Sequence, residues 1–175
     1  WDATAQHSLS PFSDSGIHDG LDLRDVPWRR GTGYDVERLS ALYTASDVWA
    51  RLVVKEFVEH VDDISTTRCL GFCVSVKHAE FMASIFNDAG IPSRAISGDT
   101  SDDERRAART ALADGQLRVL FSVDLFNEGL DVPAVDTLLM LRPTESPVLF
   151  LQHLGRGLSR ESGEAMCPVL EFVVL

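Results

Sequence analysis

Two short, almost uninterrupted apolar runs constrain the fold of this chain more than any other feature: LRVLFSV at 117–123 and VDTLLML at 135–141. A strand with one solvated face alternates polar and apolar residues, whereas a strand covered on both faces is apolar along most of its length. The runs are far shorter than the roughly 20 apolar residues that a membrane span requires. They therefore predict strands inside a parallel sheet that is covered by helices on both faces.

Strand-like and helical segments alternate around these runs from residue 66 onward. Further strands are predicted at 68–74, 93–97 and 166–175, and helices at 76–89, 102–114 and 147–158. Ser75, Ser101 and Ser146 stand where helix N-caps are expected, and Ser101 with Glu104 forms a capping box. The acidic residues in the first turn of 102–114 are stabilised by the helix dipole, so a catalytic cluster of carboxylates is not needed to explain them. This alternation predicts a three-layer α/β domain with a parallel sheet.

The first third of the chain differs from the rest. Residues 1–35 contain several prolines and glycines with no sustained periodicity, which predicts an irregular arm. Residues 36–62 have apolar positions at helical spacing, which predicts two helices on either side of Ser46. We therefore expect two parts: an irregular and helical extension at 1–65, and the α/β domain at 66–175.

Charge and cysteine usage limit the function classes. The net charge is −11, which argues against a protein whose whole surface binds nucleic acid but leaves room for a local basic groove. Three cysteines without a CxxC pair suit a reducing compartment, so a cytoplasmic location with no membrane contact is expected. No Cys/His spacing suits zinc, and no metal site is expected. Because the chain starts at Trp1 without a methionine, we expect it to be a fragment of a longer protein.

The stretch LQHLGRGLSR at 151–160 combines arginines with glycines. On a helix, Gln152, Arg156 and Arg160 fall at i, i+4 and i+8 and so project along one stripe. Gly155 and Gly157 leave room for another surface to approach closely. Guanidinium groups in this arrangement suit a polyanion such as a triphosphate. The alternative interpretation is a surface helix with incidental arginines.

A second polar stretch, FSVDLFNEGLDVP, follows the strand predicted at 117–123. Its Asp124, Gly129 and Asp131 would orient a hydroxyl or a ribose, or would simply form a turn. In open parallel sheets, ligands bind at the carboxyl ends of the strands, where this stretch and several other polar segments are expected. The sequence therefore predicts a binding site at that edge of the sheet.

Four stretches, in order, resemble the motifs of one family: LGFCVSVKHAEFM, SGDTSDDER, VDLFNEGLDVP and QHLGRGLSR. Together they resemble the second, RecA-like motor domain of superfamily 2 helicases and translocases, the group that includes DEAD/DEAH-box proteins. The resemblance covers about residues 66–175 and implies a three-layer RecA-like parallel sheet preceded by the partly helical extension. The phrase DLFNEGLDVP…LLMLRPTESPVLFLQHLGRG is most similar to a bacterial subgroup related to type III restriction-enzyme helicase subunits.

The resemblance implies three catalytic residues. Arg156 is the expected arginine finger, which stabilises charge on the transferred phosphoryl group, and Gln152 would link that phosphate to nucleic acid. The subgroup usually has a second arginine three residues after the first, where this chain has Ser159. Arg160 is the candidate to replace it, and a weakened ATPase is a further expectation if it does not.

The resemblance also implies binding residues. Gly129, Asp131 and Gly155 would face the nucleotide, with Asp131 directed toward the ribose. The residues expected to line the path of the nucleic acid are Ser75, Lys77, Gly98 and Arg105, which offer backbone amides and positive charge to phosphates.

The chain has no GxxxxGK[ST] phosphate loop and no Asp-Glu-x-Asp/His motif, which in this family belong to the first motor domain. The expected partners are thus that RecA-like domain of the same polypeptide and nucleic acid, DNA in preference to RNA. ATP and Mg²⁺ would be bound mainly by the absent domain, so we expect the chain alone to hydrolyse no ATP.

The alternative hypothesis is a non-catalytic module that binds nucleic acid or protein on a helicase-like fold. The acidic balance and Ser159 favour this alternative, whereas the retained Gln152, Gly155 and Arg156 speak against it. A doubly wound nucleotide-binding enzyme is excluded because no GxGxxG follows the first strand of the α/β domain.

Overall fold

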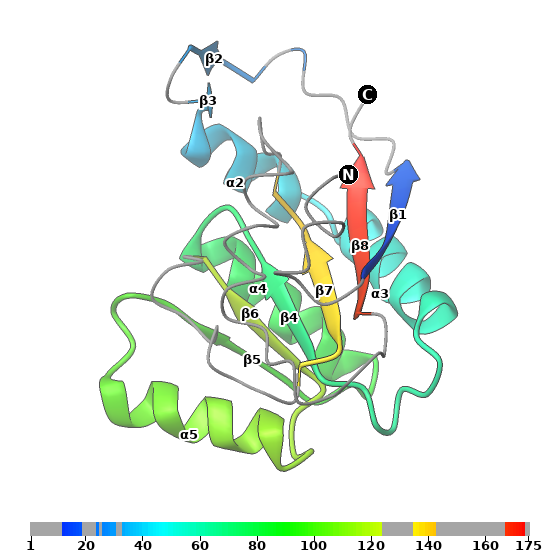
Figure 1. Ribbon diagram of the computed structural model, residues 1–175. Coiled ribbons are helices and arrows are strands. Elements are labelled where there is room, and N and C mark those ends of the chain that lie inside the picture. The colour runs from blue at the N-terminus through cyan, green and yellow to red at the C-terminus, as the bar shows by residue number, and fades with distance from the viewer. Residues whose placement is uncertain are drawn as a thin grey trace, which may run out of the picture.

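The structure, a computed structural model, describes residues 12–18, 24, 26–30, 33–123, 135–142 and 167–173. A six-stranded sheet, in which every pair of neighbours is parallel, forms its centre (Figure 1). In spatial order its strands are β1 (Phe12–His18), β8 (Cys167–Val173), β7 (Thr137–Met140), β4 (Cys69–Phe72), β6 (Val119–Ser122) and β5 (Ser93–Ile96). A separate two-stranded antiparallel hairpin joins β2 (Trp28–Arg29) to β3 (Gly33–Tyr34).

Successive residues of the central strands enter two different hydrophobic clusters. In β4, Cys69 joins one cluster, whereas Leu70 and Phe72 join the other. Of the described helices, α2 (Val36–Thr44), α3 (Asp47–His60) and α4 (Val76–Asp88) lie on the first face, and α5 (Asp102–Ala113) lies on the second face. Helices thus cover both faces, and the predicted three-layer arrangement with a parallel sheet is confirmed.

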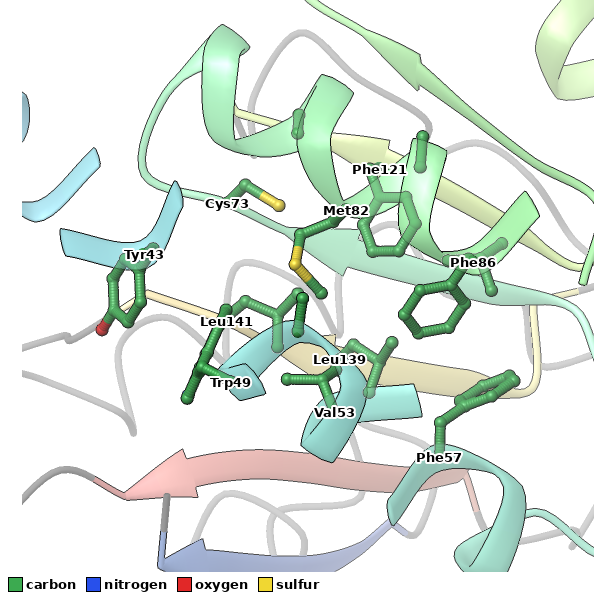
Figure 2. Close-up of a cluster of buried hydrophobic side chains, with 14 of the residues drawn as sticks. Tyr43, Trp49, Val53, Phe57, Cys73, Met82, Phe86, Phe121, Leu139 and Leu141 are labelled. Atoms are coloured by element: carbon green, nitrogen blue, oxygen red, sulfur yellow. The ribbon is translucent and has the colours of Figure 1, made fainter. Parts of the chain in front are cut away.

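The two helices that precede residue 66, α2 and α3, belong to the same hydrophobic core as the sheet. Figure 2 shows Trp49, Val53 and Phe57 of α3 directed toward the sheet, where Leu139 and Leu141 lie. These three helical residues stand at i, i+4 and i+8, so they form one apolar stripe. The boundary at 65/66 stays a prediction, but α2 and α3 contribute to the hydrophobic core of the α/β domain rather than to a separate one.

Aromatic rings extend this cluster from α3 through α4 to β6. Phe86 of α4 lies 5.5 Å from Phe57 and 5.1 Å from Phe121 of β6, measured between ring centroids. The Phe121 ring lies against Gly71 in the centre of β4, where an added Cβ would stand 2.6 Å from its Cδ1 atom. Only glycine allows the ring to approach the strand this closely.

The local signals at the helix ends are those expected from the sequence. Ser75 and Ser101 are N-caps, accepting hydrogen bonds from the amides of His78 and Glu104 at 3.0 and 3.2 Å. Two helices form on either side of Ser46, which caps α3. Positive φ angles at Gly90 and Gly115 follow the ends of α4 and α5, where glycine adopts the left-handed conformation at little cost.

One prediction for the first third of the chain is wrong. The segment FSDSGIH was expected to belong to an irregular arm, yet residues 12–18 form β1 and pair in parallel with β8 along seven residues. The segment shows no apolar alternation, so its strand conformation follows from pairing with a segment more than 150 residues away. The helix predicted at 147–158 and the cap predicted at Ser146 lie outside the described residues.

Candidate nucleic-acid interface

The carboxyl ends of β4, β5, β6 and β7 meet at one edge of the sheet, because these strands are parallel neighbours in register. Ser75 follows the end of β4, and Gly98 follows the end of β5. The two strands flank β6, so the two turns lie about two strand spacings, roughly 10 Å, apart. The structure therefore brings the predicted residues of the first two motifs to the same edge.

The first turn of α4 presents unpaired amides. The hydroxyl of Ser75 accepts the amide of His78, while the amides of Val76 and Lys77 make no hydrogen bond to any described residue. The Lys77 side chain is exposed. Free amides at a helix N-terminus carry the positive end of the helix dipole and suit a phosphate oxygen. This turn can therefore bind an anion, with the Lys77 ammonium beside it.

A buried histidine packs behind this turn and accepts a hydrogen bond from the backbone that leads into it. His78 is fully buried, and its Nδ1 accepts the amide of Val74 at 3.2 Å. Its ring stacks on Tyr43 of α2, with centroids 4.8 Å apart and planes 11° apart, and Trp49 of α3 lies 5.5 Å away. Burial lowers the pKa of His78 from 6.5 to about 3, so the ring is neutral at physiological pH and carries its proton on Nε2. His78 is thus a structural residue.

The loop after β5 is shaped by its own side chains. The Thr100 hydroxyl accepts the amide of Ser97 at 3.0 Å, and the Ser97 hydroxyl accepts the amide of Asp99 at 3.3 Å. Gly98 is exposed, and a Cβ added to it would meet no atom within 4 Å. Packing within the described residues does not require glycine here, so the missing side chain leaves room for a ligand to approach the backbone.

Arg105, from α5, holds that loop. Its Nε donates to the carbonyl of Thr100 and its Nη2 donates to the carbonyl of Gly98, both at 3.0 Å. Two of its donors are therefore directed into the loop. The arrangement fixes the position of the loop relative to the N-terminus of α5.

Sequence reasoning did not assign a role to Arg142, which also lies at this edge. Directly after β7, its Nη1 donates to the carbonyl of Val123 at 3.0 Å, which ties the ends of β7 and β6 together. Burial raises the pKa of the nearby Cys73 thiol, and the positive charge of Arg142 acts against that rise. The available signal was a single arginine immediately after a long apolar run. The half-buried guanidinium adds a fixed positive charge to the edge.

At the opposite edge of the sheet, where the strands begin, the charged side chains of Arg68 and Asp136 make structural contacts. The amide of Arg68 donates to the Asp136 carboxylate at 3.0 Å, and its Nε donates to the carbonyl of Ala113 at 3.0 Å. Burial raises the pKa of Asp136, although the amide of Arg68 and the hydroxyl of Thr137 donate to its carboxylate and act against that rise. These groups connect the beginnings of β4 and β7 with the end of α5 and form no candidate site.

The predicted nucleotide site lies outside the described residues: Gly129, Asp131, Gln152, Gly155, Arg156 and Arg160. Across the described ranges, no three His, Cys, Asp or Glu side chains gather in a way that would hold a metal ion. No helix in the same ranges has the length and apolar character to cross a membrane.

Comparison with known proteins identifies the family. Residues 52–160 match the helicase conserved C-terminal domain. The chain belongs to this family. The prediction of a superfamily 2 helicase C-terminal domain is thereby confirmed, whereas its assignment to a bacterial subgroup stays a prediction.

Relatives of this helicase C-terminal domain carry helicase names. It is 28% identical over 152 residues to the "Putative ATP-dependent helicase IRC3" of Saccharomyces cerevisiae, covering 87% of this chain and 22% of that protein. It is 35% identical over 120 residues to the "Putative mitochondrial ATP-dependent helicase irc3" of Schizosaccharomyces pombe, covering 69% of this chain and 20% of that protein. The chain thus spans about a fifth of the length of these relatives.

Solved structures show the same fold for this helicase C-terminal domain. The E. coli DEAD-box protein SrmB, solved bound to the regulator of ribonuclease activity A, superposes with a TM-score of 0.60 at 19% identity, over 94% of this chain and 78% of that one. The C-terminal part of the Fun30 ATPase domain gives a TM-score of 0.59 at 9% identity, over 75% of this chain and 42% of that one. At these identities the likeness concerns the fold alone.

Proposed function

We propose that this chain is the second motor domain of an ATP-dependent helicase or translocase that acts on nucleic acid. The match of residues 52–160 to the helicase C-terminal domain carries the proposal, and the two relatives named as ATP-dependent helicases support it. In this proposal the first motor domain of the same polypeptide binds ATP and Mg²⁺, which supply the phosphoryl transfer. Closing and reopening of the cleft between the two domains would then move the nucleic acid.

The nucleic-acid path would cross the edge formed by the first turn of α4 and the loop after β5. Three observations support this placement: the amides of Val76 and Lys77 have no hydrogen-bond partner among the described residues, the Lys77 ammonium is exposed, and the space beside Gly98 is open. Phosphate contacts of this kind position a strand without reading its sequence. Ser75 would contribute its hydroxyl, and Arg105 would keep the Gly98 loop in place through its carbonyl contacts.

The nucleotide contacts rest on the resemblance of the motifs. Arg156 would act as the arginine finger, with Gln152 beside it and Arg160 in place of the arginine that Ser159 replaces. Gly129, Asp131 and Gly155 would face the nucleotide. The preference for DNA and the cytoplasmic location stay predictions. Relatives named as RNA helicases, such as the "ATP-dependent RNA helicase DHH1" of Encephalitozoon cuniculi, make RNA the competing substrate.

ATP hydrolysis by the full-length protein tests the motor. We expect turnover that DNA or RNA stimulates and that Arg156→Ala reduces strongly, because arginine fingers contribute about 10³–10⁵ in rate in related NTPases. The isolated chain should show no turnover. Full-length protein that binds nucleic acid but hydrolyses no ATP would favour the alternative, a non-catalytic binding module on a helicase-like fold.

Substitutions at two separate lysines test the proposed nucleic-acid path. The chain contains two lysines, both exposed: Lys77 at the proposed path and Lys55 on α3. Lys77→Ala should weaken binding of single-stranded nucleic acid and lower the slope of log affinity against log salt by about 0.7–0.9, the contribution of one phosphate contact. Lys55→Ala, which removes the same charge from the same chain, is the matched control. Equal losses in both variants would show that only net charge matters and would refute the placement.

A further inference from the structure

The extension reaches the proposed nucleic-acid path through one buried hydroxyl. Ser40, in the middle of α2, is 6% exposed, and its Oγ lies 2.6 Å from the Oγ of Ser75. This distance is that of a strong O–H···O hydrogen bond. The contact joins residues 35 positions apart, one in the extension and one at the first turn of α4.

α2 is held against α4 beside this contact. Tyr43, one turn after Ser40, stacks on His78, which accepts the amide of Val74 and whose own amide is capped by Ser75. The carbonyl of Ser40 accepts the hydroxyl of Thr44 at 2.7 Å. The packing of α2 against α4 therefore fixes the position of the Ser40 hydroxyl.

Hydrogen-bond capacity decides which serine must donate. A serine hydroxyl has one proton and two acceptor lone pairs. One lone pair of Ser75 accepts the amide of His78. If Ser75 also gave its proton to Ser40, it would have none for a phosphate oxygen, which only accepts. If Ser40 donates instead, both lone pairs of Ser75 are used and its proton is available.

We propose that Ser40 is a positioning residue for nucleic-acid binding: it donates its hydroxyl proton to Ser75, so that Ser75 can donate to a backbone phosphate. The inference rests on the proposed function, since it assumes that the first turn of α4 meets the strand. It assigns to the extension a role in binding that lies outside the four stretches that resemble helicase motifs. Successive hydroxyl donors polarise one another, so the Ser75 contact is stronger with Ser40 in place than without it.

A double-mutant cycle on the full-length protein tests the inference. Binding of a fluorescent single-stranded oligodeoxynucleotide, and of RNA of the same sequence, is measured by anisotropy. We expect Ser40→Ala to weaken binding about three- to tenfold, the effect of one hydrogen bond. Because Ser40 acts through Ser75, the double variant should bind no more weakly than Ser75→Ala alone. Ser40→Thr keeps the hydroxyl and should retain most of the affinity.

The matched control is Ser46→Ala, which removes the N-cap of α3 in the same extension without touching Ser75. It should lower the melting temperature and leave affinity unchanged. An equal loss of affinity in Ser46→Ala, additive losses in the cycle, or unchanged binding by Ser40→Ala would overturn the role of Ser40. When the role of Ser40 is refuted, Lys77→Ala shows whether the proposed path is refuted as well. If Lys77→Ala binds like the wild type, the path is also refuted. If Lys77→Ala weakens binding, the path stands and only the role of Ser40 is refuted.

Discussion

The buried His78 makes the stability of the chain depend on pH in a range where a surface histidine would matter little. In the folded chain, burial lowers the pKa of His78 from 6.5 to about 3, and Nδ1 accepts the Val74 amide. Protonation would place two donors opposite each other and a charge among aromatic rings. The unfolded chain binds this proton more readily, so the stability contribution is complete above about pH 6.5 and is lost as the pH falls from there toward 3.

The magnitude follows from the two pKa values. Each tenfold change in proton concentration within this window costs about 1.4 kcal/mol, so the free energy of unfolding should fall by about 2–3 kcal/mol between pH 7 and pH 4.5 through His78 alone. That is a large part of the 5–15 kcal/mol of a typical domain.

Urea unfolding of the 175-residue chain across this range measures the effect. Carboxylates titrate in the same window, so the informative quantity is the difference between wild type and His78→Phe, which keeps an aromatic ring but cannot titrate. The variant should be less stable at pH 7, because the Val74 amide loses its acceptor, and the difference should shrink by about 2–3 kcal/mol on going to pH 4.5. A constant difference would refute the reasoning. So would the same shrinkage in His60→Gln, at the exposed end of α3.

Four further substitutions test the packing and the loop. Gly71→Ala should destabilise the chain by about 1–3 kcal/mol, because the added Cβ would overlap a buried aromatic ring, whereas Gly98→Ala, with open space around its Cβ, should change urea stability little. Asn87→Ala should cost about 1–3 kcal/mol, since both amide atoms of that side chain bond the backbone of Ser93, at 2.8 and 3.0 Å; a midpoint equal to that of the wild type would contradict this. Arg105→Ala should increase hydrogen exchange at the amides of the loop after β5 and leave α4 unchanged; uniform acceleration across the domain would show global destabilisation instead.

Much of the fold could be predicted from local patterns. The apolar runs at 117–123 and 135–141 contain β6 and β7, and the serines at 75 and 101 mark the beginnings of α4 and α5, because burial on both faces and helix capping are encoded within a few neighbouring residues. β1 could not be predicted in this way. Its sequence has no strand periodicity, and its conformation depends on pairing with β8.

The candidate site shows the same division. The order of the motifs was sufficient to bring Ser75, Lys77 and Gly98 to one edge of the sheet, since parallel strands end on the same side. The partners of these residues were not predictable. The contact of Ser75 with Ser40 joins segments 35 residues apart, and the guanidinium of Arg105 turns toward the loop carbonyls, a choice of side-chain conformation that spacing does not encode.

The pairing of β1 with β8 has a consequence for how the chain is made. Phe12 lies opposite Cys167 in the register, so β1 pairs with the described strand that is farthest from it in the sequence. At about 5–20 residues per second, β1 waits roughly 8–30 s for its neighbour. Until then the β7 edge of the growing sheet has no partner from this strand pair, and unpaired edges are sites where chains associate wrongly. We therefore expect slow or interrupted translation between β7 and β8 to reduce the yield of native protein more than the same delay after β8.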